Sequence, residues 1–168
     1  MSSSGNSPSP RPTAFLDRDG TINVKAPEGE YVTTWQQFRF LPGAERAVGL
    51  LREAGWRVIV VSNQRGVALG RMSAQDVEDI HRRMQETAPV DAVYWCPHER
   101  GVCECRKPGV KLFRDAARDF PGLELRGAVV IGDAESDMEA GRRIGARTVL
   151  VGDPPRPSLL QAVEELLA

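Results

Sequence analysis

The 168-residue sequence is poor in several features, and each shortage excludes a class of protein. Its apolar runs are all short, which excludes a membrane-spanning helix. The 22 basic and 23 acidic residues give a net charge of −1, so no excess of positive charge predicts binding to nucleic acid or to an anionic membrane. Three cysteines, an odd number, argue against a disulfide framework. With no signal-peptide core, these features predict a cytoplasmic protein, and we expect a monomer.

The sequence does contain enough apolar residues for one packed core. Hydrophobic residues make up 41% and charged residues 27% of the chain, which is typical of a globular domain. The first residues are almost all Ser, Gly, Asn and Pro. We therefore predict a disordered leader over residues 1–12 and one domain over residues 13–168.

Short apolar strands alternate with amphipathic helices along that domain. The strands are expected at 14–16, 58–61, 92–95, 128–131 and 148–151, each apolar on both faces as buried parallel strands are. The helices are expected near 44–54, 74–86, 109–119, 137–144 and 158–167. Ser73 with Asp76 resembles a capping box, and Gly55 and Gly145 stand where helices are expected to end. The alternation predicts an α/β, Rossmann-like domain with a central parallel sheet in three layers.

Polar residues follow four of the predicted strands: Asp17, Ser62, Cys96 and Asp133. Ligands of open parallel sheets bind at the carboxyl ends of the strands. The sequence therefore predicts a site at one edge of the sheet.

The first of these segments reads Asp17-Arg18-Asp19-Gly20-Thr21. A carboxylate such as Asp17 can act as a nucleophile toward phosphorus, and Asp19 can then protonate the leaving oxygen and later activate water. Gly20 allows the sharp turn that this division of labour needs. The alternative interpretation of Asp-x-Asp is a solvated turn at the end of a strand.

Four further residues suit a phosphorylated substrate. Ser62 can donate a hydrogen bond to a phosphoryl oxygen, with Asn63 and Arg65 placed to orient the rest of a substrate. Lys107, one of three lysines against nineteen arginines, can neutralise both a nucleophile and an incoming phosphate.

A magnesium site is predicted beside them. Asp133 at the end of the fourth strand can bind Mg²⁺ together with Asp17 and the backbone carbonyl of Asp19. Asp137 is expected to support the loop or to cap the following helix.

Three thiols and one imidazole lie within ten residues, at Cys96, His98, Cys103 and Cys105. Four such ligands suit a tetrahedral Zn²⁺ and leave no open position, so we interpret the zinc as structural, holding the loop that carries Lys107. A redox pair or unpaired buried thiols are the alternative. The other histidine, His81, stands beside Arg82 and Arg83 and is expected to be solvated.

Together these motifs resemble the haloacid-dehalogenase superfamily of phosphotransferases in its small, capless form. The resemblance covers residues 15–151 and rests on Asp-x-Asp-Gly-Thr, a strand ending in Ser, a Lys and a late Gly-Asp-x-x-x-Asp. It implies a Mg²⁺-dependent phosphomonoesterase that works through an aspartyl phosphate. In that scheme Asp17 is the nucleophile, Asp19 the general acid and base, Ser62 and Lys107 stabilise the phosphoryl group, and Asp133 binds the metal.

A closer resemblance, carried by residues 15–23, 62–66 and 105–108, is to the heptose 1,7-bisphosphate phosphatases and, less closely, to the histidinol-phosphate phosphatases. It implies a small phosphorylated substrate, with a sugar bisphosphate losing its 7-phosphate as the first expectation and histidinol phosphate as the alternative. The substrate is expected to contact Asn63, Gln64, Arg65 and Arg106. This chain departs from the pattern at Ala134, in extra residues between Val24 and Gly29 and in a short metal loop.

Two other classes of protein share part of these features. A signalling receiver domain also has clustered aspartates and a lysine, but needs no general acid beside the nucleophile. A zinc-organised interaction module would need none of the carboxylates.

Overall fold

The computed structural model describes residues 10–168, and its centre is a five-stranded parallel sheet in the order β3-β2-β1-β4-β5. The strands are β1 (Thr13–Leu16), β2 (Arg57–Asn63), β3 (Ala92–Cys96), β4 (Val129–Gly132) and β5 (Arg147–Leu150). The predicted α/β fold with a parallel sheet is confirmed. The strand that carries Asp17 at its end, β1, lies in the middle of the sheet.

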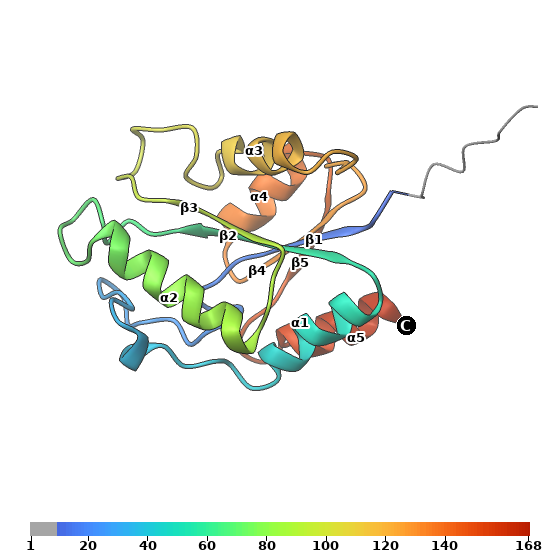
Figure 1. Ribbon diagram of the computed structural model, residues 1–168, viewed down its shortest axis with the longest axis horizontal. Coiled ribbons are helices and arrows are strands. Elements are labelled where there is room, and N and C mark those ends of the chain that lie inside the picture. Colours follow the sequence, from blue (N-terminus) through green and yellow to red (C-terminus); the bar gives the residue numbers. More distant parts are fainter. Residues whose placement is uncertain (1–9) are drawn as a thin grey trace, which may run out of the picture.

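Helices cover both faces of the sheet, so the molecule has three layers (Figure 1). They are η1 (Trp35–Gln37, a 3-10 turn), α1 (Ala44–Glu53), α2 (Ala74–Thr87), α3 (Lys111–Asp119), α4 (Glu135–Arg143) and α5 (Leu159–Leu167). α1, α2 and α5 lie on one face, and α3 and α4 lie on the other. No helix within residues 10–168 is both long enough and apolar enough to cross a membrane.

The helix ends follow from local sequence. At the start of α2, the Asp76 amide donates to Ser73 Oγ (3.1 Å) and the Ser73 amide donates to Asp76 Oδ2 (2.7 Å), which confirms the predicted capping box. After α1, Gly55 has a φ of +83°, a conformation that favours glycine and ends the helix.

The strands separate two apolar cores because successive side chains point to opposite faces. Ala14 and Leu16 pack toward α1, α2 and α5, whereas Phe15 packs toward α3 and α4 and meets Phe113 edge to face at 5.0 Å. All four residues of β1 are buried. The expectation of burial on both faces is wrong for β3 and β5, which are mostly half-buried because they form the edges of the sheet.

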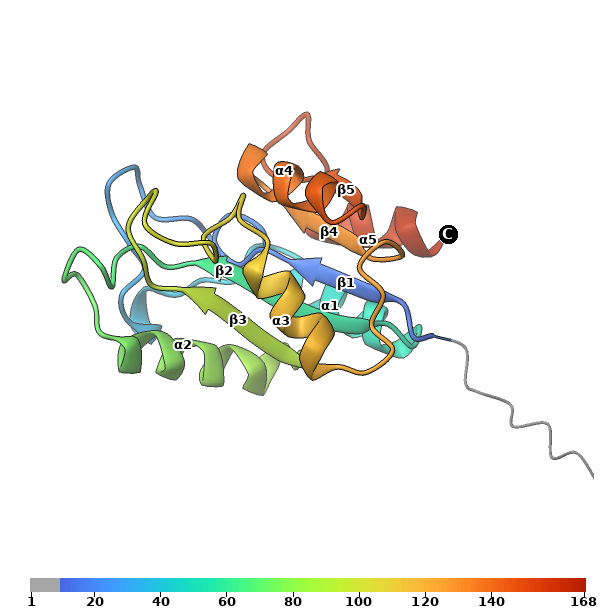
Figure 2. The same cartoon turned by 90° about the horizontal axis from the view of Figure 1, so that it is seen from above.

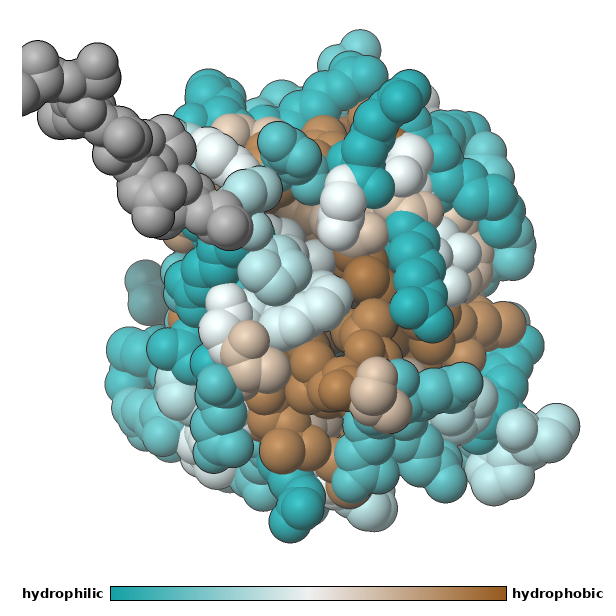
Figure 3. Space-filling view, turned by 90° about the vertical axis from the view of Figure 1, so that its right-hand side faces the viewer, coloured by the Kyte–Doolittle hydropathy of each residue, from teal (hydrophilic) through white to brown (hydrophobic). Residues whose placement is uncertain are grey.

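The loops that follow β1, β2 and β3 gather at the end of the sheet where these strands finish (Figure 2). The opposite end presents an apolar area bordered by hydrophilic side chains (Figure 3). Of the predicted leader, residues 1–9 lie outside the described part of the chain. Next to them, Arg11 donates to the carbonyl oxygens of Gly55 and Trp56, and the Arg57 amide donates to Pro12 O.

Candidate active site

A cavity of about 330 Å³ opens at the carboxyl end of the sheet. It brings together eight of the residues predicted for catalysis, substrate or magnesium binding: Asp17, Asp19, Asn63, Gln64, Arg65, Arg106, Lys107 and Asp133. Ser62 is fully buried beneath the cavity and is not among its lining residues.

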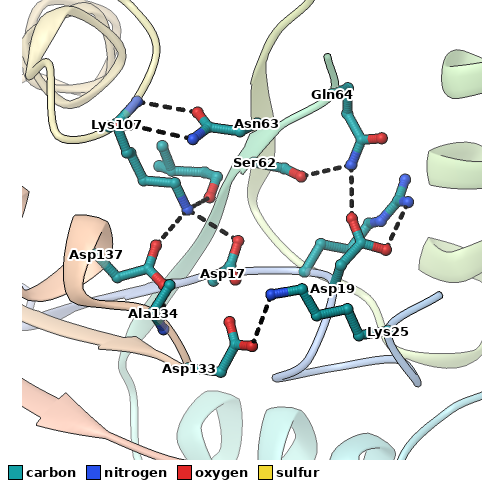
Figure 4. A network of polar contacts seen from close by, with 12 residues as sticks. Asp17, Asp19, Lys25, Ser62, Asn63, Gln64, Lys107, Asp133, Ala134 and Asp137 are labelled. Atoms are coloured by element: carbon teal, nitrogen blue, oxygen red, sulfur yellow. Dashed lines mark hydrogen bonds and ion pairs between the residues drawn. The ribbon is translucent and has the colours of Figure 1, made fainter. Parts of the chain in front are cut away.

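Lys107 connects the loop after β3 to the end of β1 (Figure 4). Its Nζ lies 2.8 Å from Asp17 Oδ1 and 2.6 Å from Asp137 Oδ1, and it also donates to the Val61 carbonyl at 2.6 Å. Burial alone would lower the pKa of Lys107, but the charges of Asp17 and Asp137 outweigh it and raise the pKa above the ordinary value. A permanently charged ammonium therefore lies against Asp17.

Asp19 is held by three side chains. Its Oδ1 accepts hydrogen bonds from Arg18 and Asn23, both at 2.9 Å, and its Oδ2 accepts one from Gln64 at 2.9 Å. Burial acts to raise the pKa of Asp19, but the Arg18 charge and these hydrogen bonds together lower it below the ordinary value. The two aspartates of the Asp-x-Asp segment thus have different cationic partners, Lys107 for Asp17 and Arg18 for Asp19.

Ser62 and Asn63 form hydrogen bonds to other residues of the site, which the sequence did not predict. Ser62 Oγ accepts a hydrogen bond from Gln64 Nε2 at 2.7 Å, the same nitrogen that reaches Asp19 (Figure 4). Asn63 accepts from the Lys107 amide (2.9 Å) and donates to the Lys107 carbonyl (3.2 Å). Ser62 at the end of β2 therefore orients Gln64, which binds Asp19. Asn63, the next residue, fixes the backbone of Lys107, which binds Asp17.

Three carboxylates lie close enough to share a metal ion. Oxygen atoms of Asp17, Asp133 and Asp137 lie within 4.8 Å of one another. Asp133 Oδ1 is buried with no hydrogen-bond partner among the described residues, and burial together with Asp17 raises the pKa of Asp133 to about 7. Burial and Asp17 also raise the pKa of Asp137. A buried, unpartnered carboxylate oxygen in an all-oxygen group fits the ligand preference of Mg²⁺.

Asp137 has the supporting role that the sequence predicts. Its Oδ2 accepts a hydrogen bond from the Ala134 amide at 3.1 Å at the start of α4, while its Oδ1 faces Lys107. One carboxylate thus ties the helix to the lysine.

Gly20 is required where the chain turns after Asp19. Its φ is +85°, and a Cβ built on it would lie 2.1 Å from Asp133 Oδ2. The turn after β1 is therefore packed directly against the carboxylate at the end of β4.

Lys25 is a residue of the site that the sequence reasoning missed. Its Nζ lies 3.4 Å from Asp133 Oδ2, and it lines the cavity together with Ala134. The sequence feature that pointed to Lys25 is the set of extra residues between Val24 and Gly29. An insertion beside the first motif that carries a lysine can return to the sheet edge.

The far end of the cavity is basic. Arg65 pairs with Glu99 and lies 3.5 Å from the Tyr31 hydroxyl. Arg106 and Arg100 line the same region, and Arg106 NH1 is buried without a hydrogen-bond partner among the described residues. Burial, with the charge of Arg100, lowers the pKa of Arg106. Arg106 forms no ion pair among the described residues.

The four predicted zinc ligands meet in the loop after β3. Cys96 Sγ lies 3.2 Å from Cys105 Sγ and 3.6 Å from Cys103 Sγ, and His98 Nδ1 lies 3.0 Å from Cys105 Sγ. Zn–S bonds of about 2.3 Å give a tetrahedron with edges of roughly 3.8 Å, close to these separations. The Cys₃His donor set fits a structural zinc, and the loop that it would close leads directly to Arg106 and Lys107.

The prediction for His81 is wrong. This residue lies on the inner face of α2, is 2% exposed and has its Nε2 3.1 Å from Arg18 NH1. Burial and the Arg18 charge lower the pKa of His81 to about 3, so the ring is neutral. Its neighbours Arg82 and Arg83 do face solvent, which is why the local sequence suggested an exposed position.

Comparison with known proteins identifies the class. A family model described as HAD-hydrolase-like matches residues 104–160. The solved structure of D,D-heptose 1,7-bisphosphate phosphatase from B. bronchiseptica, complexed with magnesium and phosphate, superimposes with a TM-score of 0.80 at 30% identity, covering 92% of this chain and 97% of that one. The fold and the site thus define an enzyme of the HAD-like hydrolases, a phosphatase.

Two curated relatives narrow the assignment. A D-glycero-alpha-D-manno-heptose-1,7-bisphosphate 7-phosphatase from Mycobacterium bovis is 44% identical over 138 residues, 79% of this chain and 72% of that protein. A D-glycero-beta-D-manno-heptose-1,7-bisphosphate 7-phosphatase from Rhodopseudomonas palustris is 40% identical over 148 residues, 80% of each. The chain belongs to the family of heptose-1,7-bisphosphate 7-phosphatases. As an enzyme of this family it is neither a receiver domain nor a zinc-organised interaction module without catalysis.

Proposed function

We propose that this phosphatase removes the 7-phosphate of D-glycero-D-manno-heptose 1,7-bisphosphate through an aspartyl phosphate on Asp17, with Mg²⁺ as cofactor. The observation that carries the proposal is the arrangement of Asp17 against the Lys107 ammonium at 2.8 Å, with Asp19 held separately at the same cavity. The names of the relatives support the choice of substrate.

In the first half of the reaction a carboxylate oxygen of Asp17 attacks the phosphorus of the ester. The bond between phosphorus and the ester oxygen breaks, and that oxygen takes a proton from Asp19 and leaves as the sugar hydroxyl. Lys107 neutralises Asp17 and the approaching phosphoryl oxygens, which lowers the repulsion between two anions.

In the second half Asp19, now ionised, removes a proton from water. The water oxygen attacks the same phosphorus, the bond between phosphorus and Asp17 breaks, and inorganic phosphate leaves. Asp19 returns to its protonated form and Asp17 to its carboxylate form, so the cycle balances. Ser62 and Gln64 keep Asp19 in place through both halves.

Asp17 and Asp133 would hold the Mg²⁺, with the Asp19 carbonyl as a further ligand. Bound there, the ion supplies positive charge that offsets the charge on the transferred phosphoryl group. Asp133 has a free buried oxygen for this purpose, and Lys107 already compensates Asp137.

The distal phosphate of the substrate would lie at the basic end of the cavity. Arg106 has an unpartnered, buried nitrogen there, and Arg65 is held in position by Glu99. A guanidinium without an anion favours a ligand that supplies one. The zinc in the cysteine loop would be structural, fixing the chain beside Arg106.

The test is phosphate release by the purified enzyme with and without Mg²⁺. The substrates are both anomers of the heptose 1,7-bisphosphate, fructose 1,6-bisphosphate and histidinol phosphate. We expect Mg²⁺-dependent turnover with a preference for a heptose bisphosphate. Asp17→Asn should lower kcat by at least about a thousand-fold, because no nucleophile remains.

Asp115→Asn is the matched control, since Asp115 is paired with Lys111 on α3, away from the cavity. This variant should turn over at the wild-type rate. Undiminished turnover by Asp17→Asn would refute the mechanism. A preference for histidinol phosphate would refute the substrate and leave the mechanism standing.

A further inference from the structure

A fully buried guanidinium lies directly behind Asp19. Arg18 has no exposed surface, its NH2 lies 2.9 Å from Asp19 Oδ1 and its NH1 lies 3.1 Å from His81 Nε2. The guanidinium also lies over the Phe38 ring at 5.9 Å. A buried charge is costly unless it is paired, and among the described residues Asp19 is the carboxylate that pairs with Arg18.

His81 lies against the NH1 edge of this guanidinium. Arg18 can only donate hydrogen bonds, so His81 must accept at Nε2 and carry its hydrogen at Nδ1 as a neutral ring. A neutral acceptor satisfies one edge of the guanidinium without cancelling its charge. Among the described residues, Asp19 is therefore the anion that the positive charge of Arg18 faces.

The hydrogen bonds also distinguish the two oxygens of Asp19. Oδ1 accepts from both Arg18 and Asn23, which uses both of its lone pairs. Among the described residues, Oδ2 accepts only from Gln64 and retains a free position. A proton on this carboxyl group has to be carried by Oδ2.

We propose that Arg18 and His81 are positioning residues that fix Asp19 so that Oδ2 carries the proton to and from the reacting oxygens. The proposal rests on the proposed role of Asp19 as general acid and base. It assigns to α2, through His81, a part in the reaction although that helix contributes nothing to the lining of the cavity.

The dependence of kcat on the leaving group distinguishes this positioning role from a purely structural one. Hydrolysis of a sugar phosphate needs a proton on the leaving oxygen, whereas 4-nitrophenolate leaves with little help. Loss of the His81 acceptor should therefore lower kcat for the heptose bisphosphate more than kcat for 4-nitrophenyl phosphate. For His81→Leu we expect the ratio of the two kcat values to fall roughly tenfold.

His81→Gln is the rescue variant, since its amide oxygen offers Arg18 a neutral acceptor, and the ratio should stay near the wild-type value. His81→Glu should lower the ratio even if His81→Leu does not fold, because a carboxylate there competes with Asp19 for Arg18. Arg82→Gln, on the exposed face of the same helix, is the matched control and should leave the ratio unchanged.

Asp19→Asn in the same assay separates the two proposals. If Asp19→Asn does not lower the ratio, the proposed function of Asp19 fails. If Asp19→Asn lowers it and neither His81→Leu nor His81→Glu does, the positioning role alone is refuted. An equal loss on both substrates in the His81 variants would also refute that role.

Discussion

Cationic partners distinguish the carboxylates that surround the cavity. Asp17 and Asp137 share the Lys107 ammonium, while Asp19 has the buried Arg18 to itself. Opposite charges and hydrogen bonds favour the ionised form, and their absence together with burial favours the neutral form. The same side-chain type therefore meets different electrostatic surroundings within one small space.

The negative charge of Asp133 has Lys25, at 3.4 Å, as its cationic partner among the described residues. With so distant a partner, the position of this carboxylate is sensitive to a change at Gly20. We predict that Gly20→Ala lowers phosphatase activity at least about tenfold and raises the Mg²⁺ concentration needed for half-maximal rate, because the new Cβ collides with Asp133 Oδ2. A titration of initial rate with Mg²⁺ measures both effects.

Gly122→Ala is the control for the backbone part of this effect. Gly122 has the same φ of +85°, but a Cβ there meets nothing within 4 Å. This variant should lose a similar amount of stability and no activity. Equal losses of activity in the two variants would contradict the assigned contact.

Among single residues, the sequence predicted the ones that stand at strand ends. Asp17 and Asp133 directly follow β1 and β4, and Asp19 lies two residues beyond Asp17, so topology places them at one edge. Lys107 lies in the loop after β3 and was predicted from its place behind the cysteine cluster. Arg18 and His81 were missed because a charged side chain is expected to be solvated, and only tertiary packing buries these two. Lys25 was missed although the insertion that carries it stands beside the first motif, because the sequence does not say which loop residue returns to the edge of the sheet.

The loop between β3 and α3 is the element on which the site most depends. It holds the cysteine cluster and then presents Arg106 and Lys107 to the cavity, and Asn63 binds its backbone from β2. The residues of this loop bury few apolar side chains of their own. We therefore expect the metal to supply most of its stability.

Removal of zinc should consequently impair catalysis without touching a catalytic group. We predict that Cys103→Ser lowers the zinc content below one ion per chain, lowers the Tm and lowers kcat at least about tenfold, because the Lys107 backbone is no longer fixed. Metal analysis, thermal unfolding and phosphate release measure the three effects. Val102→Ala, an exposed neighbour in the same loop, should behave as wild type; full activity of zinc-free protein would contradict the prediction.

Element boundaries were well predicted because their signals are local. The Ser73 cap, Gly55 and the apolar runs each act over a few residues, and they placed the five strands and the five α-helices to within a few residues. The short η1 was not predicted. The depth of burial of β3 and β5 was not predictable in this way. It depends on strand order, which no local signal contains.

On the scale of the whole molecule, the cavity is bordered by loops. Within residues 10–168, the stretch between β1 and α1 contains a single regular element, the short η1, and this stretch supplies Lys25, Tyr31 and Val32 to the cavity. Choice of substrate is then a property of loop composition.

The burial of His81 should make the free energy of unfolding depend on pH. The pKa of His81 is about 3 in the folded chain and about 6.5 when unfolded, so between these values only the unfolded chain binds the proton. Its stabilising contribution is complete above pH 6.5 and is lost as pH falls toward 3. In urea unfolding from pH 7.5 to 4.5, the wild type should lose up to about 1.4 kcal/mol per pH unit more than His81→Gln.

Titrating carboxylates are common to both proteins, so they cancel in the comparison. Parallel curves of unfolding free energy against pH would show that His81 is protonated in the folded protein and would contradict the neutral ring.

The central position of β1 in the sheet has a consequence for folding during synthesis. β1 is made first, yet one of its two neighbours is β4, which follows only after most of the chain. Pairing across so long a segment closes a large loop and is slow compared with hairpin or helix formation. A nascent or truncated chain that ends before β4 can fold helices and pair β1 with β2. It lacks Asp133 and the strand that pairs with β1 on its other side. Phosphatase activity therefore arises only once synthesis has passed β4 and Asp133.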